Sequence, residues 1–347
     1  MSLFSRLFPH AFIAILAVIF AIYFRLYEVF LVEEITDEGI VSLRGRSEQE
    51  IVEYLLKKKH KVVATPCSPT NSCFVVVDSY HFEDEALVVR RNLLHRGNSA
   101  YSLTGVELQP PPKITWRSAD TRKWRVNKLV VDARYAKVMV AAGFFMESLD
   151  FDEGKHQEVL MAGLGGGVIS NFFSQIDYLN ISTIAVEIDP FIVNIAKQWF
   201  DNEETANLQI IRGDFIPFLG ELQQETKRYD AIIVDVCHSD TRELICPIEE
   251  VRNEEVIRKL QAILSETGTL ILNICAISNH EQNEEALLKE FDPFFNTCFL
   301  LKYLPNRRML ICSNRPNWSW EDNKERFLSN LEKVDDIFDF RLTSFFQ

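Results

Sequence analysis

The sequence predicts an α/β fold, a mostly parallel sheet with helices on both of its faces. The first observation is that apolar runs of strand length alternate with helical segments beyond residue 155. The second is a pair of strand-like runs near the end, separated only by Pro305-Asn306-Arg307, which is typical of a hairpin. The third is a glycine-rich turn directly after the first of these runs, where such sheets bind ligands.

The predicted strands are apolar, as expected for strands that are buried on both faces of a sheet. They span residues 158–162, 183–187, 208–211, 231–235 and 269–274. Helical segments follow them over residues 167–177, 190–200, 214–224, 250–265 and 281–290. The hairpin occupies residues 297–304 and 308–312, and a helical stretch over 320–334 closes the chain. The sheet is therefore expected to have seven strands, with one strand of the hairpin running antiparallel.

A smaller α+β region is expected to precede this domain. Ser47 and Glu50 have the spacing of a helix-capping box, which predicts a short amphipathic helix over residues 48–59. Three β-branched or aromatic runs predict a small antiparallel sheet, over residues 73–78, 85–90 and 101–108. We expect a linker at Pro110–Pro112, ahead of a helix that begins after Asp132. Residues 31–125 are predicted to form this smaller region, and residues 126–347 the larger α/β domain. Residues 1–30 form a separate N-terminal segment, predicted to be a membrane anchor.

The N-terminal segment of the sequence is strongly apolar. Eighteen residues without Asp, Glu, Lys or Arg separate Arg6 from Arg25, close to the roughly 20 that a helix needs to cross a bilayer. We expect an uncleaved single-span helix, because the stretch has no polar face and bulky residues follow Phe24. A cleaved signal peptide is the alternative. Positive charges flank both sides of the segment, so they do not predict its orientation.

Composition excludes functions more readily than it names them. The 347 residues carry 37 Lys and Arg against 50 Asp and Glu, a net charge of −13, which argues against nucleic-acid binding through bulk charge. The seven cysteines show no CxxC pair and no His at metal-ligand spacing, so neither a zinc site nor a disulfide scaffold is predicted. We expect reduced, mostly buried thiols. Two N-glycosylation motifs, Asn180-Ile-Ser182 and Asn317-Trp-Ser319, are short matches that arise often by chance.

Glycines and acidic residues stand at the ends of successive predicted strands. The first strand runs into Gly163-Leu-Gly165-Gly-Gly167, where missing side chains let the backbone approach a ligand. Glu187 ends the second strand, 20 residues beyond Gly167, a distance typical of a carboxylate that binds ribose hydroxyls. Asp214 and Asp235 follow the third and fourth strands. Because parallel strands end at one edge of a sheet, we expect these signals to form one crevice for an adenosine.

These motifs resemble the spermidine-synthase-like branch of the class I S-adenosylmethionine-dependent methyltransferases, whose sheet is Rossmann-like. Within that branch the sequence is most similar to the C-terminal domain of the elongation factor 1A lysine and N-terminal methyltransferases. The likeness covers roughly residues 125–313 and includes Val186-Glu-Ile-Asp-Pro190, Cys246-Pro247 and Gly268-Thr-Leu-Ile-Leu-Asn273. It is weaker across the small β region and absent from the apolar segment.

The resemblance implies an enzyme that transfers methyl from S-adenosylmethionine to an amine, such as a protein lysine or N-terminus. The cofactor-binding residues that it implies are Gly163, Gly165, Gly167, Glu187, Asp214, Phe215 and Asp235. Asp235, His238 and Asp240 are the candidates for an acidic pocket that holds the amine before it loses its proton. No metal is implied. A protein substrate and the membrane are the expected partners, a homodimer is left open, and cofactor supply favours a cytosolic catalytic domain.

Two alternatives to methyl transfer stay open. Polyamine synthases of the same branch use an Asp-x-x-Asp-Pro pattern to hold a diamine, but the matching stretch here, Asp235-Val-Cys-His-Ser-Asp240, is longer and lacks the proline. The aspartate that those enzymes carry in the glycine turn is also missing, because Val168 follows Gly167. Both departures speak against aminopropyl transfer. The other alternative is a membrane-tethered interaction protein that keeps the fold without catalysis.

Overall fold

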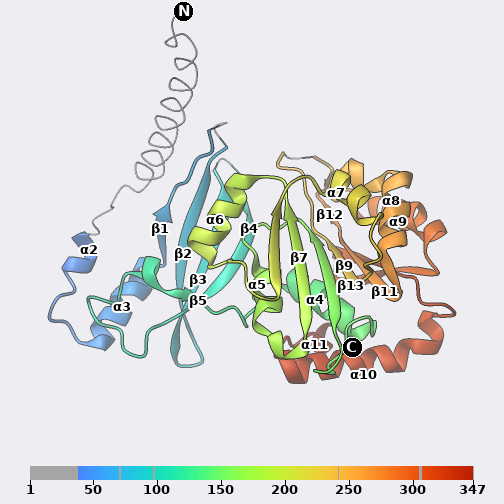
Figure 1. Cartoon of the computed structure of the whole chain (residues 1–347). Helices are drawn as coiled ribbons and strands as arrows, with labels where there is room; N and C mark the ends of the chain where they lie inside the picture. The colour runs from blue at the N-terminus through green and yellow to red at the C-terminus, as the bar shows by residue number, and fades with distance from the viewer. Residues whose placement is uncertain (1–37, 70–71, 97, 241, 305–306, 347) are drawn as a thin grey trace, which may run out of the picture.

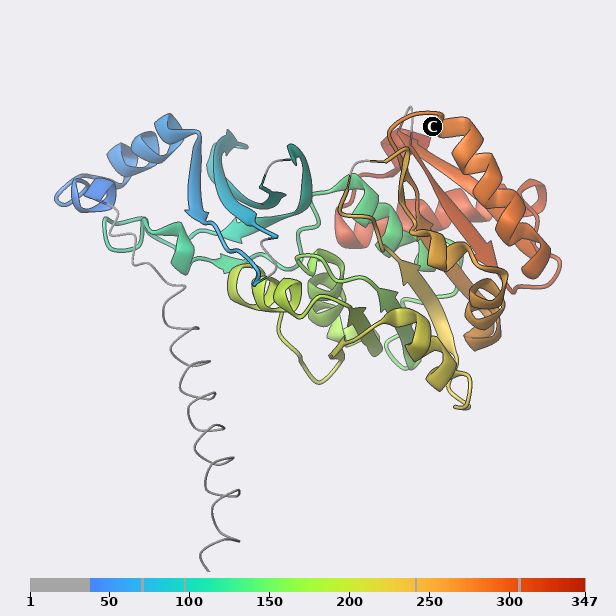
Figure 2. The same ribbon diagram turned by 90° about the horizontal axis from the view of Figure 1, so that it is seen from above.

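The computed structural model describes residues 38–346 except 70–71, 97, 241 and 305–306, and these form two sheets that lie side by side (Figure 1). The view from above shows the same two parts, with the smaller sheet toward the beginning of the described chain (Figure 2). The predicted membrane segment, residues 7–24, lies outside the described residues. Within the described ranges, no helix is both long and apolar enough to span a bilayer.

The first sheet has five antiparallel strands in the order β1-β2-β3-β4-β5. Its three central strands confirm the predicted antiparallel sheet and are longer than expected. The two outer strands are not predicted, because β1 is short and begins with polar residues and β5 has only two residues. α3 (Glu48–Lys58) packs against β2, and both hydrogen bonds of the predicted capping box are present at its start. The strands are β1 (His60–Ala64), β2 (Phe74–Glu83), β3 (Ala86–His95), β4 (Asn98–Gln109) and β5 (Arg125–Val126).

The second sheet has seven strands in the order β13-β14-β11-β9-β6-β7-β8. Five of them run parallel, and β14 runs antiparallel to both of its neighbours, which confirms the predicted mixed sheet and its hairpin. The parallel strands are β6 (Gln157–Ala162), β7 (Ile181–Glu187), β8 (Leu208–Arg212), β9 (Tyr229–Val234) and β11 (Leu264–Asn273). The hairpin is β13 (Thr297–Leu304) and β14 (Arg307–Ser313), and a separate short pair is β10 (Leu244–Cys246) and β12 (Cys275–Ala276).

Helices cover both faces of the second sheet, as predicted. Alternate residues of β9 show the division, because Ala231 and Ile233 belong to one apolar cluster and Ile232 and Val234 to the other. The first cluster contains α4 (Arg134–Phe145), α5 (Val168–Gln175), α6 (Pro190–Phe200) and α10 (Trp320–Phe338). The second contains α7 (Phe215–Leu222), α8 (Glu254–Ile263) and α9 (His280–Phe291). Burial on both faces explains why the inner stretches of these strands, such as residues 231–234 and 270–272, are apolar.

The first sheet contacts the second domain through a buried arginine and through a threonine that packs against a glycine. Arg91 on β3 forms a buried ion pair with Asp78 on β2, with 2.8 Å between Nε and Oδ1. The same guanidinium donates a hydrogen bond of 3.2 Å to the carbonyl of Trp199, which lies on α6. Thr104 on β4 lies so close to Gly166 that a side chain at this glycine would collide with it. The first sheet is therefore packed directly behind the glycine turn of the second.

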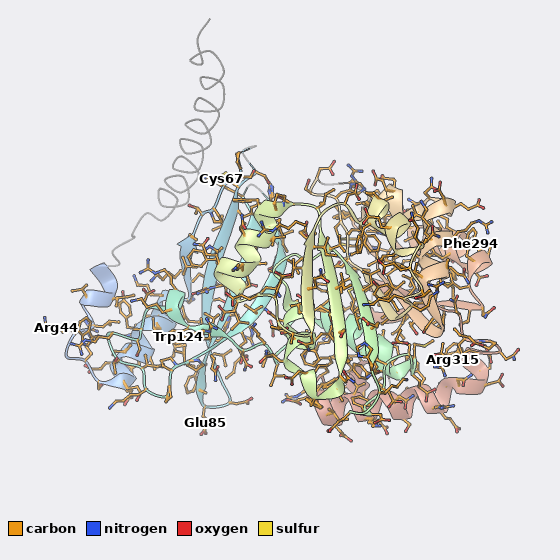
Figure 3. All side chains as sticks on the ribbon, in the orientation of Figure 1. Arg44, Cys67, Glu85, Trp124, Phe294 and Arg315 are labelled. Carbon is orange, nitrogen blue, oxygen red and sulfur yellow. A yellow bond between two sulfur atoms is a disulfide. The ribbon has the colours of Figure 1, made fainter. Side chains whose placement is uncertain are left out.

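The cysteines correct the prediction of reduced thiols. Six of the seven form disulfides, Cys67–Cys73, Cys237–Cys246 and Cys298–Cys312, and the seventh, Cys275, is free. Cys298 and Cys312 are direct partners in the register of β13 and β14, and Cys67 lies at the upper end of the first sheet in Figure 3. Sequence spacing does not reveal these pairs, because strand pairing and loop geometry bring their members together rather than a short motif.

Candidate active site

The carboxyl edge of the second sheet brings predicted site residues into one row. Strand register places one residue of each of four strands side by side, through the pairs Leu272–Val234, Val234–Ala162 and Ala162–Val186. The next residue along the chain after each of these forms the edge. In order across the edge, these residues are Asn273 at the end of β11, Asp235 just after β9, Gly163 just after β6 and Glu187 at the end of β7. This edge is where open α/β sheets bind their ligands.

The glycine turn has a backbone conformation that other residues rarely adopt. Gly163, Gly165 and Gly167 have positive φ angles of 89°, 55° and 78°. A Cβ at Gly163 would collide with the carbonyl group of Asp235, and one at Gly167 would collide with the side chain of Asn202. A Cβ at Gly165 would meet nothing within 4 Å. Packing therefore requires two of these glycines, while the third borders open space.

Glu187 is 9% exposed, and backbone groups fix both of its carboxylate oxygens. Oε2 accepts a hydrogen bond of 3.0 Å from the N–H of Leu164 in the glycine turn. Oε1 accepts one of 2.9 Å from the N–H of Asp189. Because each carboxylate oxygen has two lone pairs, both can still accept hydrogen bonds from the hydroxyls of a ribose. The carboxylate is therefore oriented before any ligand arrives.

Asp214 and Phe215 stand where β8 leads into α7. The Oδ1 of Asp214 accepts a hydrogen bond of 2.9 Å from the N–H of Ile216, so this side chain caps the helix. Asp214 is exposed, whereas Phe215 is buried. The N–H of Gly213 donates to the carbonyl of Glu187 at 2.9 Å. This bond continues the row of site residues to the third strand end.

Asp235 lies in the middle of the row and is half-buried. Its Oδ1 accepts a hydrogen bond of 2.7 Å from the Nδ2 of Asn273. Loss of solvation raises the pKa of the Asp235 carboxyl, the bond from Asn273 lowers this pKa, and the nearby carboxylate of Glu187 raises it again, with an increase as the net result. Such a carboxyl takes up a proton more readily than a surface aspartate does, which suits a group that receives protons.

Two tyrosines linked electrostatically to Asp235 are candidate site residues that the sequence reasoning misses. Tyr135 comes from α4 and Tyr303 from β13, and Tyr303 is 5% exposed. Loss of solvation raises the pKa of both phenols, and the charge of Asp235 raises both further. The hydroxyls therefore stay protonated at neutral pH. Tyr135 lies within the stretch that resembles known methyltransferases, but no spacing rule connects a helix before the first strand, or a hairpin after the last, to this edge.

His238 and Asp240 belong to a second cluster, on the loop after β9. The Nε2 of His238 lies 2.6 Å from the Oε2 of Glu249 and 3.1 Å from the Nη1 of Arg242. Arg242 also forms a two-point ion pair with Asp240, which holds the pKa of Asp240 below its ordinary value. Among the described residues, no hydrogen bond or ion pair joins this cluster to Asp235. The described contacts thus do not unite the three residues in one acidic pocket.

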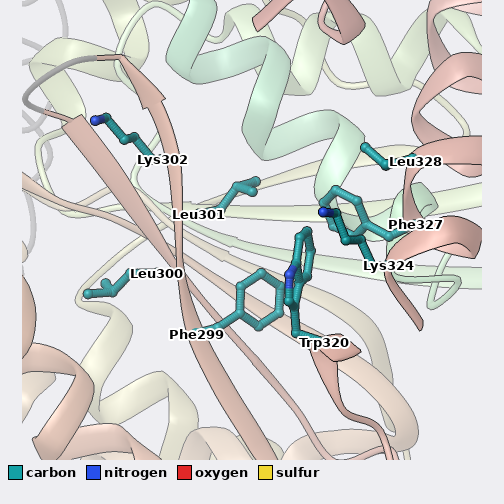
Figure 4. Close-up of a pocket in the computed structure, with 8 residues that line it drawn as sticks. All are labelled: Phe299, Leu300, Leu301, Lys302, Trp320, Lys324, Phe327 and Leu328. Carbon is teal, nitrogen blue, oxygen red and sulfur yellow. The ribbon is translucent and has the colours of Figure 1, made fainter. Parts of the chain in front are cut away.

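A cavity of about 340 Å³ lies elsewhere, between β13 and α10 (Figure 4). It is lined by apolar side chains, among them Phe299 and Trp320, and by Lys302 and Lys324. The cavity shares no lining residue with the row at the carboxyl edge of the sheet, so it is separate from the crevice at the glycine turn.

Comparisons with known proteins bear on the family of this chain. No protein-family profile matches it. The eEF1A lysine and N-terminal methyltransferase of Danio rerio is 32% identical over 143 residues, which is 40% of this chain and 20% of that protein. This likeness confirms the resemblance that the motifs predict. The matched part spans only a fifth of that relative's own length.

Solved structures share the fold. Human methyltransferase-like protein 13, in complex with SAH, superimposes with a TM-score of 0.51 at 22% identity, over 58% of this chain and 92% of that one. A probable spermidine synthase from Corynebacterium glutamicum superimposes with a TM-score of 0.55 at 13% identity, over 80% and 94%. At these identities the likeness shows the fold alone, an α/β fold common to a methyltransferase-like protein and a probable spermidine synthase.

Proposed function

We propose that this protein is an S-adenosylmethionine-dependent methyltransferase that methylates an amine, such as a protein lysine or N-terminus. The observation that carries the proposal is the row of Asp235, Gly163 and Glu187 at the carboxyl edge, with the carboxylate of Glu187 already oriented. The similarity to the eEF1A lysine and N-terminal methyltransferases supports the same reaction type. Because that similarity spans a fifth of the relative, we assign the acceptor by its chemistry alone.

The residues at the crevice fit an adenosyl cofactor. Glu187 would hold the ribose hydroxyls with its remaining lone pairs, and Asp214 has a second oxygen that would accept the adenine amino group. The open space beside Gly165 would receive the methionine portion, where the turn presents backbone rather than side chains. S-adenosylmethionine has no pyrophosphate, so Val168 does not conflict with this assignment, although a dinucleotide would favour a third glycine there.

The second half of the crevice fits an amine acceptor. When bound, S-adenosylmethionine supplies a methyl group that its sulfonium activates for in-line displacement. Asp235 stands beside the cofactor residues, and its raised pKa suits it to accept the proton that an ammonium loses before its nitrogen reacts. The protonated phenols of Tyr135 and Tyr303 would orient the nitrogen by accepting its N–H groups. Positioning and exclusion of water are the main contributions of such a site.

Cofactor binding is the first test. We expect calorimetry on the purified full-length protein to detect S-adenosylmethionine binding, and Glu187→Ala to weaken it about 100-fold, since each hydrogen bond to a charged acceptor contributes about 1.5 kcal/mol. Glu221→Ala removes an exposed glutamate from α7 and is the matched control, which should bind normally. A wild-type protein that does not bind the cofactor would refute the proposal.

Catalysis needs a second test, because an interaction protein of this fold could keep the crevice without turnover. We expect labelled methyl from the cofactor to appear on lysine or N-terminal amines of proteins in a cell extract, and the label to be lost in Glu187→Ala. An assay with decarboxylated S-adenosylmethionine and a diamine tests aminopropyl transfer. It should show no product, because the stretch from Asp235 to Asp240 lacks the pattern that holds the diamine.

We also propose that residues 7–24 anchor the protein in a membrane. The support is the uncharged stretch between Arg6 and Arg25. An anchored chain stays in the membrane pellet after alkaline extraction and keeps its N-terminus, which sequencing of the mature protein would show. A mature chain that begins after Phe24 would identify a cleaved signal peptide instead.

A further inference from the structure

Three disulfides connect cysteines in separate parts of the fold. Cys67–Cys73 lies between β1 and β2, Cys237–Cys246 joins the loop after β9 to the end of β10, and Cys298–Cys312 joins β13 to β14. The members of each pair are 6, 9 and 14 residues apart, so no pair is a CxxC redox motif. Structural disulfides persist in oxidising compartments and are rare in the reducing cytosol. A set that pairs six of seven cysteines therefore favours an oxidising compartment.

The two N-glycosylation motifs are both displayed on the surface. Asn180 follows the short 3-10 helix η3 (Asp177–Leu179), and Asn317 lies in the turn before α10. Both asparagines are exposed, and both have positive φ angles, of 51° and 56°. The residue between Asn and Ser is not proline in either motif. N-linked glycans attach to such motifs on surface turns of secreted proteins.

Both motifs lie away from the candidate active site. The carbonyl of Asn180 accepts a hydrogen bond of 3.1 Å from the N–H of Gln157, at the beginning of β6. The last residue of β14, Ser313, pairs with Thr269 rather than with the end of β11, so the chain enters the Asn317 turn from the amino edge of the sheet. A glycan on either asparagine therefore leaves the carboxyl edge accessible.

We propose that the folded domain resides in an oxidising, glycosylating compartment and carries N-linked glycans on Asn180 and Asn317. Each Asn Nδ2 forms a bond to the anomeric carbon of a lipid-linked oligosaccharide diphosphate. The bond from that carbon to the phosphate oxygen breaks, Nδ2 releases a proton, and the lipid diphosphate leaves. Each disulfide forms as two thiols pass two electrons and two protons to the disulfide of a protein oxidoreductase, which leaves as a dithiol.

This inference is independent of the proposed enzyme activity. It differs from the cytosolic location of the catalytic domain that cofactor supply favours. A cleaved signal peptide at residues 7–24 would deliver the chain to such a compartment, and an anchor there would do so in the orientation that places its C-terminal side in that compartment. If methyl transfer holds as well, the amine acceptor is a molecule of the same compartment, and the cofactor has to be delivered there.

Expression of the tagged full-length chain in cultured animal cells tests the glycans. A peptide N-glycosidase should increase the gel mobility of the wild type, and Asn180→Gln and Asn317→Gln should each remove one of two mobility steps. Ser319→Ala should remove the same step as Asn317→Gln. Ser319→Thr keeps the motif and also the helix cap, in which Ser319 Oγ accepts from Asp322 N at 3.2 Å, so its glycan should remain. A wild-type mobility that the glycosidase does not change overturns the proposal.

Thiol counting tests the compartment separately. Cells are quenched with acid, so that no disulfide forms after lysis, and the denatured protein is labelled with a maleimide polymer that adds one gel step per free thiol. We expect one step without reductant, from Cys275, and seven steps after reduction. Cys275→Ser should abolish the single step. Seven steps without reductant would show a reduced chain and overturn the proposal.

Discussion

The two halves of the crevice differ in where their polar groups come from. In the half formed by β6, β7 and β8, the acidic residues stand at strand ends and accept hydrogen bonds from nearby backbone, Glu187 from the N–H of Leu164 and Asp214 from that of Ile216. In the half formed by β9, β11 and β13, Asp235 interacts electrostatically with side chains from distant elements, Tyr135 on α4 and Tyr303 on β13. The first half depends on local sequence, and the second depends on tertiary packing.

The largest expected effect comes from the backbone of the first half. Gly163→Ala adds a Cβ that collides with the carbonyl of Asp235, at a φ angle of 89° that alanine disfavours. The turn has to shift, so affinity for S-adenosylmethionine should fall more than about 100-fold, because over 2.7 kcal/mol of binding would be lost. Gly220→Ala, where a Cβ meets nothing within 4 Å, is the control and should bind normally by calorimetry.

Asp235→Asn should separate activity from stability in the second half. Loss of its proton acceptor should lower kcat about 100-fold, while removal of a poorly solvated carboxylate should raise the free energy of unfolding on the order of 1 kcal/mol at neutral pH. Denaturant titration and turnover assays measure the two effects. A variant that keeps full activity would remove Asp235 from the proton-accepting role.

The pH dependence of that stability gain has a definite sign. Because the folded state raises the pKa of Asp235, the folded protein binds this proton more tightly than the unfolded chain does. The wild-type carboxyl is therefore least unfavourable when protonated. The advantage of Asp235→Asn should shrink as the pH falls toward about 3.9, the ordinary aspartate pKa. An advantage that grows on acidification would contradict the raised pKa.

Tyr303→Phe tests whether the packed half of the crevice contacts the acceptor. Loss of one hydrogen bond should raise KM for the amine roughly fivefold to tenfold, with cofactor affinity unchanged. Tyr229→Phe is a matched control at the amino end of β9, because the Tyr229 hydroxyl is buried without a hydrogen-bond partner among the described residues. Removing that hydroxyl should leave both constants unchanged. Equal effects of the two variants would assign Tyr303 to the core rather than to the site.

Asp214→Ala has a smaller expected effect, because Asp214 is exposed. Cofactor affinity should fall about fivefold, and loss of the α7 cap should cost roughly 1 kcal/mol of unfolding free energy. Asp214→Asn keeps a good cap, so its stability should return to that of the wild type. Thermal unfolding with and without cofactor distinguishes the capping contribution from the binding contribution.

Asp240→Asn should have the smallest effect. Arg242 already pairs with Asp240 in solvent, and such exposed pairs contribute little. Turnover should change less than about twofold. A loss comparable to that of Asp235→Asn would restore the acidic pocket that the sequence suggests and would end the division of the crevice into a local and a packed half.

Much of the fold follows from the sequence for physical reasons. Strand residues that are buried on both faces have to be apolar, so the sequence shows the second sheet as five separated apolar runs and a hairpin. The capping box at Ser47 is equally local and is confirmed. β5 is missed because it has only two residues. The disulfides are missed because pairing of Cys298 with Cys312 depends on the register of two strands.

The candidate site divides in the same way. Gly163 and Glu187 are predictable because the turn and the carboxylate act where they stand in the chain. Tyr303 is unpredictable because its place beside Asp235 requires the whole sheet order from β13 to β9. His238 and Asp240 follow β9 closely, but Arg242 and Glu249 draw them into a different cluster.

The contact between Thr104 and Gly166 gives the small sheet a mechanical role. Four glycines in five residues would make an isolated turn flexible. A flexible turn would lose conformational entropy on ligand binding, which would weaken the affinity. The side chain of Thr104 packs directly behind that turn. Arg91, which is paired with Asp78 in the same sheet, donates a hydrogen bond to the carbonyl of Trp199 and so links this sheet to α6. The first sheet thus supports the glycine turn from behind and limits its movement.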